Sequence, residues 1–527
     1  MRIKPYLIYF LVATVFFGSL SCNKSRSKKE MPLGCVTNKE EFKKTDIFEP
    51  LDGGSPKNSI PSAYSLRKFC PKRGNQGQQS SCVGWSSSYG GRTILQAYAT
   101  GANPNDIAFS PSFIYNSIRE SDCSHGTFIG DALDMMINTG DIALSEFPYD
   151  ANSCDQKPDE SQLNKAGAFR IEGYNRLTDG DKFSINLNAI KQNISQGAPV
   201  IIAVPVGGSF DKLYGEKIWE PTDDDYAELE KYKNGDYDNC ALGGHAMCLI
   251  GYDDNFEGGS VEIMNSWGED FGEEGIFWMR YSDFKNFCRE AYGFFPVERK
   301  NADNLSFGAS VGLLINKTRD YMALEHSKGY TFTTDEQNIG TKFKMEVTNS
   351  IACYTYVIGL DTNGESYILF PYTDNHSPYC GITGTRVFPG DYSMQLDNIG
   401  KKDLMAVILT KDAIDINNIN DKVNKSKASG YEARVKEALG SQLIAVNDLD
   451  FETNKTVDFK VKESDKNAVL IVVEINKNGS GNNTNNTKRN DDNDNNNSND
   501  DNSDDDNTTQ DEDNDDPSLI DDYNNAK

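Results

Sequence analysis

Apolar residues recur at helical spacing early in this chain and give way to continuous apolar runs further on. The helical spacing predicts helices at 86–100, from Ser110-Pro111-Ser112 onward, and at 130–139. The later runs predict buried strands at 198–204, 245–252, 260–264 and 275–280. Helices followed by strands within one unit predict an α+β fold for residues 60–299.

A long polar stretch interrupts the strands of this unit. Residues 210–243 are rich in Asp, Glu and Tyr, and the core of the stretch at 220–238 carries few apolar residues. The composition predicts a solvated insertion in loop form. The alternative is a flap beside the functional site that selects substrates by charge.

The pattern changes again after residue 300. Strand-like runs at 344–347, 354–360, 366–370, 404–409 and 469–475, with a hairpin turn at Asn363-Gly364 and one helix at 431–439, predict a mostly-β sandwich over residues 300–475. This part resembles an uncharacterised β-sandwich module of exported bacterial proteins through residues such as Tyr354-x-Tyr356-Val357 and Pro389-Gly390. Residues 476–527 are almost entirely Asn, Asp, Ser and Thr and are predicted to be a disordered tail.

The N-terminus reads as a targeting segment. Arg2 and Lys4 precede an apolar run at 6–17, and a small-residue exit leads to Cys22. A signal that ends at cysteine resembles a bacterial lipoprotein signal, which implies lipidation at Cys22 and a membrane anchor, although Ser19 departs from the usual leucine. The alternative is an ordinary secretory signal. Both place the protein outside the cytoplasm, at the cell envelope or secreted, with residues 23–59 as a polar tether.

Charge and composition narrow the possible partners. The net charge of the 527 residues is −27, but residues 478–527 contribute −12 of it, so the rest of the chain is only moderately acidic. No basic patch or basic-aromatic alternation occurs, so no nucleic-acid partner is expected.

The eleven cysteines suit an oxidising compartment. None has the spacing of zinc ligands, so no metal or other cofactor is expected. Connectivity cannot be read from sequence; Cys123–Cys154 and Cys353–Cys380 are two possible local pairs.

One cysteine is a candidate nucleophile. Cys82 follows Gln76 by six residues, lies among small residues and precedes a predicted helix, whose N-terminus favours a thiolate. A base is needed, and the histidines are His125, His245, His326 and His376. His125 lies in the same unit, but His245 begins an apolar strand after two glycines. Asn265, after the next strand, can orient the His245 ring.

The order of these residues resembles the papain-like cysteine peptidases. The matching motifs, which span about residues 60–297, are Asn75-Gln76-Gly77, Ser81-Cys82, Gly244-His245-Ala246, Gly251-Tyr252, Asn265-Ser266-Trp267-Gly268 and Phe147-Pro148-Tyr149. The resemblance implies a two-lobed domain with a helical lobe and a β-barrel-like lobe. It implies Cys82 as nucleophile, His245 as general base and acid, Asn265 as the orienting group and Gln76 as oxyanion donor. For substrate binding it implies Gly126, Ala246 and Trp267, which also shields the His245–Asn265 bond.

This resemblance implies hydrolysis of peptide bonds in protein or peptide substrates through a thioester. Three departures stand out: Val83 replaces the usual Trp, Gln79 replaces a disulfide cysteine, and the long helical pro-region is missing. The loss of a cysteine at Gln79 favours the Cys123–Cys154 pair. The alternative functions are a catalytically degenerate lipoprotein that binds protein or glycan, and exopeptidase or transpeptidase action by the same residues.

Overall fold

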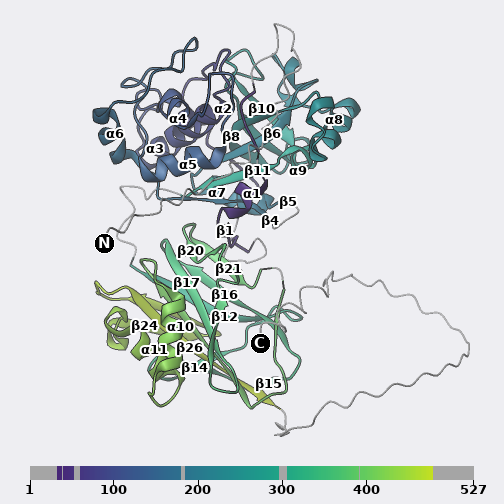
Figure 1. Ribbon diagram of the computed structural model, residues 1–527. Helices are drawn as coiled ribbons and strands as arrows, with labels where there is room; N and C mark the ends of the chain where they lie inside the picture. The colour runs from purple at the N-terminus through teal and green to yellow at the C-terminus, as the bar shows by residue number, and fades with distance from the viewer. Residues whose placement is uncertain are drawn as a thin grey trace, which may run out of the picture. The chain divides into compact units, whose positions relative to one another are not determined.

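The computed structural model describes residues 33–37, 39–52, 60–179, 184–295, 306–390 and 392–478. The targeting segment with Cys22 and the tail from residue 479 onward lie outside the described residues. The chain divides into two compact units (Figure 1). The N-terminal unit comprises Met1–Phe48, Asn58–Asn304 and Asn375–Ser377, and the C-terminal unit comprises Glu49–Lys57, Leu305–Asp374 and Pro378–Lys527.

The N-terminal unit packs helices beside a large sheet. Its helices are α1 (Lys39–Lys44), α2 (Cys82–Gly84), α3 (Thr93–Thr100), α4 (Pro111–Ile118), α5 (Ile129–Asn138), α6 (Glu160–Ala166), α7 (Leu187–Ser195), α8 (Asp223–Lys233) and α9 (Tyr281–Phe287). A π-helical segment, η2 (Trp85–Arg92), joins α2 to α3, so one continuous helix runs from Cys82 to Thr100. A Cβ at Gly91 would lie 2.4 Å from the Phe294 ring, which shows how closely this helix approaches the sheet.

The sheet of this unit has the strand order β19-β1-β3-β11-β6-β8-β9-β10-β7, with β2 paired to β8. Its strands are β1 (Ile47–Phe48), β2 (Ala63–Ser65), β3 (Tyr174–Arg176), β6 (Val200–Val206), β7 (Ile218–Trp219), β8 (Gly243–Asp253), β9 (Ser260–Met264), β10 (Ile276–Arg280), β11 (Glu290–Phe294) and β19 (His376–Ser377). A separate hairpin pairs β4 (Thr178–Asp179) with β5 (Ser184–Ile185). The predicted helices and strands of this unit are confirmed, and the fold is α+β.

The prediction of a loop at 210–243 is wrong in one respect. Within this stretch α8 forms a helix, and β7 adds a strand beside β10. Thr222 caps α8 in a reciprocal capping box with Asp225, and the acidic first turn suits the positive end of the helix dipole. Leu229 and Tyr232 are buried, so even this acidic helix has an apolar face.

The segment expected as a polar tether also differs from the prediction. Its described residues contain α1 and β1, and the Phe42 ring is buried. The prediction considered only the polar composition and overlooked Phe42, whose ring packs against Tyr292.

The C-terminal unit is a β-sandwich with two helices. One sheet has the order β21-β16-β12-β25-β24, with β22 beside β16, and the other has β13-β14-β26-β23-β17-β18, with β15 beside β26 and β20 beside β17. The strands are β12 (Gly308–Ile315), β13 (Leu324–Lys328), β14 (Thr331–Thr334), β15 (Gln337–Asn338), β16 (Lys342–Asn349), β17 (Cys353–Leu360), β18 (Ser366–Phe370), β20 (Tyr379–Cys380), β21 (Gly384–Phe388), β22 (Met394–Gln395), β23 (Lys402–Thr410), β24 (Leu449–Asn454), β25 (Thr456–Val461) and β26 (Ala468–Asn478).

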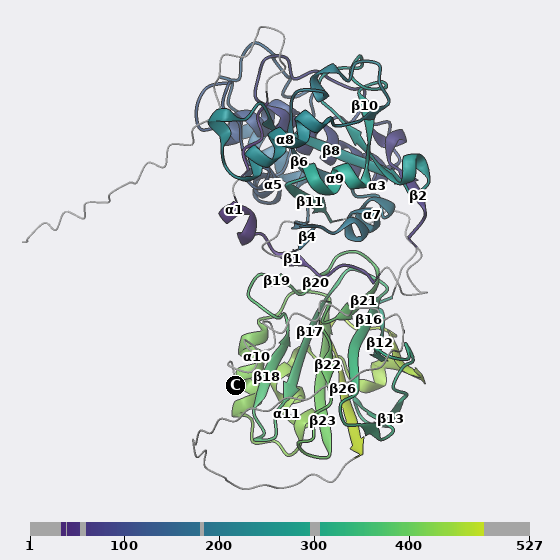
Figure 2. The same ribbon diagram turned by 90° about the vertical axis from the view of Figure 1, so that its right-hand side faces the viewer.

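Two helices, α10 (Ile416–Lys425) and α11 (Tyr431–Leu439), contact the larger sheet of this unit (Figure 2). Only α11 was predicted; α10 is strongly amphipathic, with Ile416, Ile419 and Val423 on its buried face. The hairpin at Asn363-Gly364 is confirmed, and Gly364 takes the positive φ of 85° that the turn requires. The two sheets share one apolar core.

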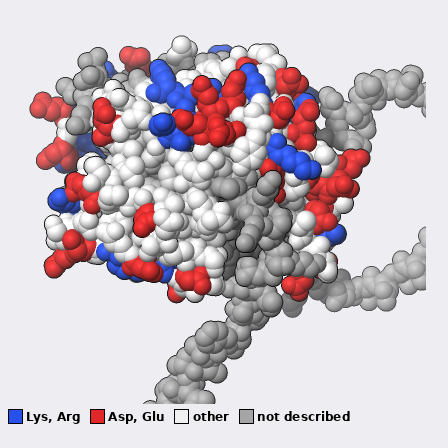
Figure 3. Space-filling view, turned by 90° about the horizontal axis from the view of Figure 1, so that it is seen from above, with Lys and Arg blue, Asp and Glu red and all other residues white. Residues whose placement is uncertain are grey.

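Surface charge is mixed on the face shown in Figure 3. Acidic and basic side chains are interspersed there around an area without charged side chains. Among the described residues, no helix is long and apolar enough to cross a membrane, and no group of three or more His, Cys, Asp or Glu side chains could hold a metal ion.

Cys353 and Cys380 are predicted to form a disulfide when the protein meets an oxidant. They face each other across β17 and β20, both are buried as free thiols, and a hydrogen bond from the Cys353 thiol lowers the pKa of Cys380. A thiolate beside a thiol is the reactive form for oxidation. Oxidised glutathione, which accepts the two electrons and two protons, should yield a Cys353–Cys380 crosslink in the peptide map of unreduced protein. Persistent free thiols at both positions would contradict the prediction.

Candidate active site

Cys82 begins the long helix of the N-terminal unit. Ser81 is the N-cap, so the thiol lies at the helix end where backbone N–H groups concentrate positive potential. The side chain is fully buried. Its Sγ accepts the backbone N–H of Ala246 at 3.4 Å, and the N–H groups of Gly34, Val83 and Cys82 itself also face the sulfur.

His245 and Asn265 are brought together by adjacent antiparallel strands. His245 lies on β8, and Asn265 directly follows β9, where Met264 pairs with Cys248. His245 Nε2 lies 2.7 Å from Asn265 Oδ1. Because an amide oxygen only accepts, Nε2 carries the proton and Nδ1 is the basic nitrogen. Nδ1 is buried and has no hydrogen-bond partner among the described residues, so it is the nitrogen that could take a thiol proton.

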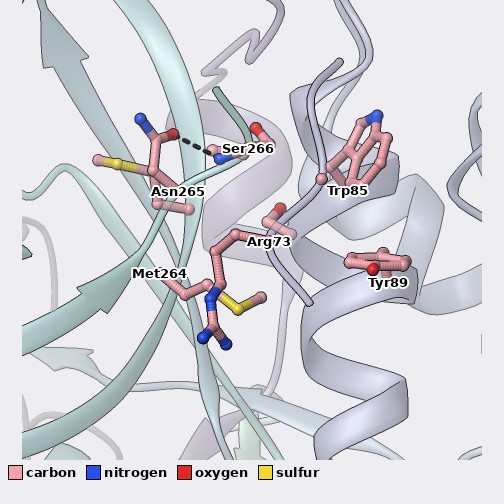
Figure 4. Close-up of a pocket in the computed structure, with 10 residues that line it drawn as sticks. Arg73, Trp85, Tyr89, Met264, Asn265 and Ser266 are labelled. Carbon is pink, nitrogen blue, oxygen red and sulfur yellow. Dashed lines mark hydrogen bonds between the residues drawn. The ribbon is translucent and has the colours of Figure 1, made fainter. Parts of the chain in front are cut away.

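The Asn265 amide is itself held in place. Its Oδ1 accepts the backbone N–H of Ser266 at 2.8 Å, the dashed line in Figure 4. The same view shows Trp85 and Tyr89 on the opposite side of the small pocket that Asn265 lines. The amide orientation, and with it the His245 tautomer, is therefore set by the backbone of the loop that follows β9.

Aromatic rings enclose the imidazole. The Trp267 ring centroid lies 4.9 Å from that of His245, and the buried Phe210 ring lies 6.3 Å away. Burial lowers the pKa of His245 to about 4 and raises the pKa of Cys82 to about 11. Both shifts follow from burial, which disfavours the charged form of each group. Sequence reasoning missed Phe210 because it placed this residue at the start of a loop.

Gln76 is fixed beside Cys82 by a set of hydrogen bonds. Its backbone N–H donates to the Ser266 carbonyl at 2.9 Å, and its Oε1 accepts the Ser266 hydroxyl at 2.7 Å. Its Nε2 donates to the Gln79 carbonyl at 2.8 Å, and the Tyr149 hydroxyl donates to the Gln76 carbonyl at 2.7 Å. These bonds tie the Gln76 side-chain amide to both the helix start and the Asn265 loop.

The residues that depart from the papain pattern have their own partners. The Gln79 side chain donates to the Asp150 carbonyl, and the structure joins Cys123 and Cys154 in a disulfide. Val83 is buried, while Trp85, two residues further on, packs edge-to-face against Tyr89 and Tyr149. The segment around Gln79 is thus still tethered, through a hydrogen bond to Asp150 in place of a disulfide.

The remaining histidines lie elsewhere. His125 is exposed and its Nδ1 contacts Asp122 Oδ1 at 3.0 Å. His326 is in the C-terminal unit, where its ring bonds the Gly329 carbonyl, and His376 is in β19, which pairs with β1. None of these contacts involves the Cys82 sulfur.

An N-terminal arm, defined here as the described residues within 33–48, lies in the same site. The Cys35 N–H donates to the Gly244 carbonyl at 3.1 Å, directly before His245. On the other side, the Thr127 N–H donates to the Gly34 carbonyl at 2.9 Å and the Val36 N–H donates to the Thr127 carbonyl at 3.0 Å. The sequence signal was the short apolar run Leu33-Gly34-Cys35-Val36 within an otherwise polar stretch.

Two solved structures similar to this chain are described as cysteine proteases, and two curated proteins similar to it are named as cathepsins. Xylellain, a cysteine protease from Xylella fastidiosa, is 20% identical, with a TM-score of 0.39 and coverage of 51% of this chain and 97% of that one. The Carica candamarcensis protease CMS1MS2 is 21% identical, with a TM-score of 0.34 and coverage of 46% and 100%. Cathepsin B-like CP2 of Giardia intestinalis is 23% identical over 230 residues, which are 42% of this chain and 70% of the relative. Mouse cathepsin K is 24% identical over 221 residues, 41% of this chain and 58% of the relative.

The family model described as papain family cysteine protease matches residues 61–293. The match contains Gln76, Cys82, His245 and Asn265, and it covers most of the N-terminal unit. Residues 61–293 are therefore a papain family cysteine protease domain, and the chain is a cysteine-type peptidase.

Proposed function

We propose that the protein is an exported, lipid-anchored cysteine peptidase that hydrolyses peptide bonds with Cys82, His245, Asn265 and Gln76. One observation carries the assignment of these roles. The Ala246 N–H reaches the Cys82 sulfur at 3.4 Å, and the neighbouring His245 bonds Asn265 at 2.7 Å. These contacts support the proposal that Cys82, His245 and Asn265 act together, although 163 and 183 residues separate His245 and Asn265 from Cys82 along the chain.

The proposed reaction is acyl transfer to water. His245 Nδ1 takes the thiol proton, and the Cys82 thiolate attacks the carbonyl carbon of the scissile bond. The Gln76 amide and the Cys82 backbone N–H stabilise the oxyanion. His245 then gives its proton to the leaving amine as the C–N bond breaks, which leaves a thioester on Cys82. Water, deprotonated by His245, attacks the thioester and releases the acid and the thiol.

Substrate contacts are proposed for three residues around the thiol. Gly126 precedes Thr127, whose backbone N–H and carbonyl both bond the arm in this structure, so this edge can pair with an extended peptide. Ala246 adjoins the sulfur, and Trp267 covers the imidazole. Anchoring at the bacterial cell envelope through Cys22 rests on the sequence of the targeting segment.

The test is covalent labelling with a peptidyl epoxide under reducing conditions. Purified protein that lacks residues 1–22 should acquire one adduct, located at Cys82 by peptide mapping, with loss of peptide hydrolysis in step with labelling. The Cys82→Ala variant should show neither the adduct nor hydrolysis.

Two outcomes would overturn this proposal. Hydrolysis that persists in Cys82→Ala would assign catalysis to another residue. Saturable binding of a protein or glycan by both forms, without turnover or adduct after extended incubation, would establish the alternative of a catalytically degenerate binding lipoprotein. Analysis of the products from a defined peptide separates endopeptidase from exopeptidase or transpeptidase action.

A further inference from the structure

We propose that Tyr149 is a positioning residue, which holds the Gln76 backbone so that the Gln76 side-chain amide faces the oxyanion of the reaction. This inference rests on the proposed function of Cys82 and Gln76. Its basis is the Tyr149 hydroxyl, which bonds Gln76 and also the residue directly before Cys82.

The two hydrogen bonds of this hydroxyl run in one direction. The Tyr149 hydroxyl lies 2.7 Å from the Gln76 backbone carbonyl and 2.8 Å from the Ser81 hydroxyl. A carbonyl only accepts hydrogen bonds, so Tyr149 donates its single proton to Gln76, and the Ser81 hydroxyl donates to the Tyr149 oxygen. Burial raises the pKa of Tyr149, which keeps this proton in place at neutral pH. The bond from Ser81 therefore directs the Tyr149 proton toward Gln76.

The turn that carries Tyr149 is anchored in the helical part of the unit. The Tyr149 ring meets Trp85 edge-to-face, with the centroids 4.9 Å apart. Two residues earlier, the buried Phe147 ring packs against Phe113 at 5.9 Å, and the Phe147 carbonyl accepts the Ser110 hydroxyl at 2.5 Å. The Tyr149 hydroxyl is thus a fixed point against which Gln76 can be held.

The residues that follow Tyr149 lie along the same segment as Gln76. The Gln79 side chain donates to the Asp150 carbonyl at 2.5 Å, and a Cβ at Gly77 would lie 3.0 Å from the Cβ of Ala151. Three successive residues, 149–151, therefore support the segment 76–79. Tyr149 contributes the bond to the backbone of the oxyanion donor.

A disulfide joins this turn to a second support of the segment. The Ser80 N–H donates to the Cys123 carbonyl at 2.9 Å, and Cys123 is bonded to Cys154, which closely follows the turn. The segment from Gln76 to Ser81 contains no cysteine, so its links to the rest of the unit are non-covalent. The position of the Gln76 amide therefore depends on hydrogen bonds such as the one from Tyr149.

The test is Tyr149→Phe, which retains the ring against Trp85 and removes only the hydroxyl. We expect kcat for a fluorogenic peptide to fall about tenfold at unchanged KM. The loss is smaller than for removal of the donor, because the Gln76 amide is displaced and still present. The rate of Cys82 alkylation by iodoacetamide should equal that of wild type, since alkylation develops no oxyanion. A merely structural defect around Cys82 would lower both rates.

Tyr89→Phe is the matched control. The Tyr89 ring also packs edge-to-face on Trp85, at 4.7 Å, and its hydroxyl also donates to a backbone carbonyl, that of Lys72. Lys72 is not in the segment 76–82, so kcat should stay within about twofold of wild type. Thermal unfolding checks that both variants fold. An equal loss of kcat in Tyr89→Phe would assign the effect to the aromatic packing and overturn the proposal.

A double variant tests whether Tyr149 acts through Gln76. In the Gln76→Ala chain the side-chain donor is missing, so the addition of Tyr149→Phe should lower kcat by no more than about twofold. A further loss of about tenfold in that chain would show that the hydroxyl acts on another group, and the proposal would fail.

The remaining outcomes separate this proposal from the proposed function. Unchanged kcat in folded Tyr149→Phe, a rise in KM at constant kcat, or a parallel loss of Cys82 alkylation would overturn the positioning role and leave the peptidase standing. A wild type that neither hydrolyses peptides nor acquires the epoxide adduct would overturn both.

Discussion

Replacement of His245 by alanine is expected to lower kcat/KM for peptide hydrolysis on the order of 10⁴-fold. The variant lacks both the base that forms the thiolate and the acid that protonates the leaving amine. The measurement is hydrolysis of a fluorogenic peptide by the wild type and by the His245→Ala variant.

The matched control is His125→Ala. His125 lies between α4 and α5 in the same unit, but its ring is exposed and bonded to Asp122. Its loss should leave kcat/KM within about twofold of the parent, well below the effect of removing a general base. A large loss of kcat/KM in His125→Ala with little loss in His245→Ala would assign the base to His125 and reject the site described above.

The pH dependence of alkylation gives an independent readout of the same pair. In wild type an imidazolium at His245 next to the sulfur favours the thiolate. Alkylation of Cys82 by iodoacetamide should therefore already be fast near pH 6. Without the imidazole, the Cys82 thiol should titrate nearer the ordinary cysteine value of about 8.5, and its rate should rise with pH through that value. The sign follows because an adjacent positive charge lowers a thiol pKa and its removal raises it. Identical pH profiles of Cys82 alkylation in wild type and in His245→Ala would show that His245 does not act on Cys82.

Replacement of Gln76 by alanine is expected to lower kcat about 10²–10³-fold with little change in KM. An oxyanion donor bonds a charge that develops only in the transition state, so its loss should leave substrate binding nearly intact. Steady-state kinetics on the same fluorogenic peptide separate the two constants. A rise in KM at constant kcat would instead indicate a role in substrate binding.

Gln79→Ala is the control that shows how much of the loss of kcat in Gln76→Ala comes from a disturbed local structure and not from the missing oxyanion donor. Gln76 is held by the Gln79 carbonyl, which the substitution retains, whereas the Gln79 side chain bonds Asp150. We expect kcat to stay within about threefold of the parent. Thermal unfolding of both variants shows whether any loss reflects stability, because each substitution removes a buried hydrogen bond.

Motif order was sufficient to predict that the structure brings His245 and Asn265 together near Cys82, because the two strands that carry or precede them are adjacent. Once β8 and β9 pair as neighbours, His245 and Asn265 must lie side by side. The basic nitrogen of the imidazole was not predictable, because it depends on the Asn265 orientation that the Ser266 N–H sets. Phe210 was missed because the sequence gives no measure of which distant ring packs on an imidazole.

Secondary structure was predictable where apolar periodicity is strong, as at β6 and α5, and was missed where another signal dominates. For α8 the sequence signal of a helix start was the Thr222–Asp225 capping box, but the acidic composition of the stretch led to the prediction of a loop. The arm is a different case. At Gly34, Cys35 and Val36 it binds through backbone N–H and carbonyl groups, so the apolar run at 33–36 indicates burial but does not identify the partners.

The arm belongs to the same chain as the residues that it contacts. Its hydrogen bonds to Gly244 and Thr127 therefore form at an effective concentration on the order of millimolar, however dilute the protein is.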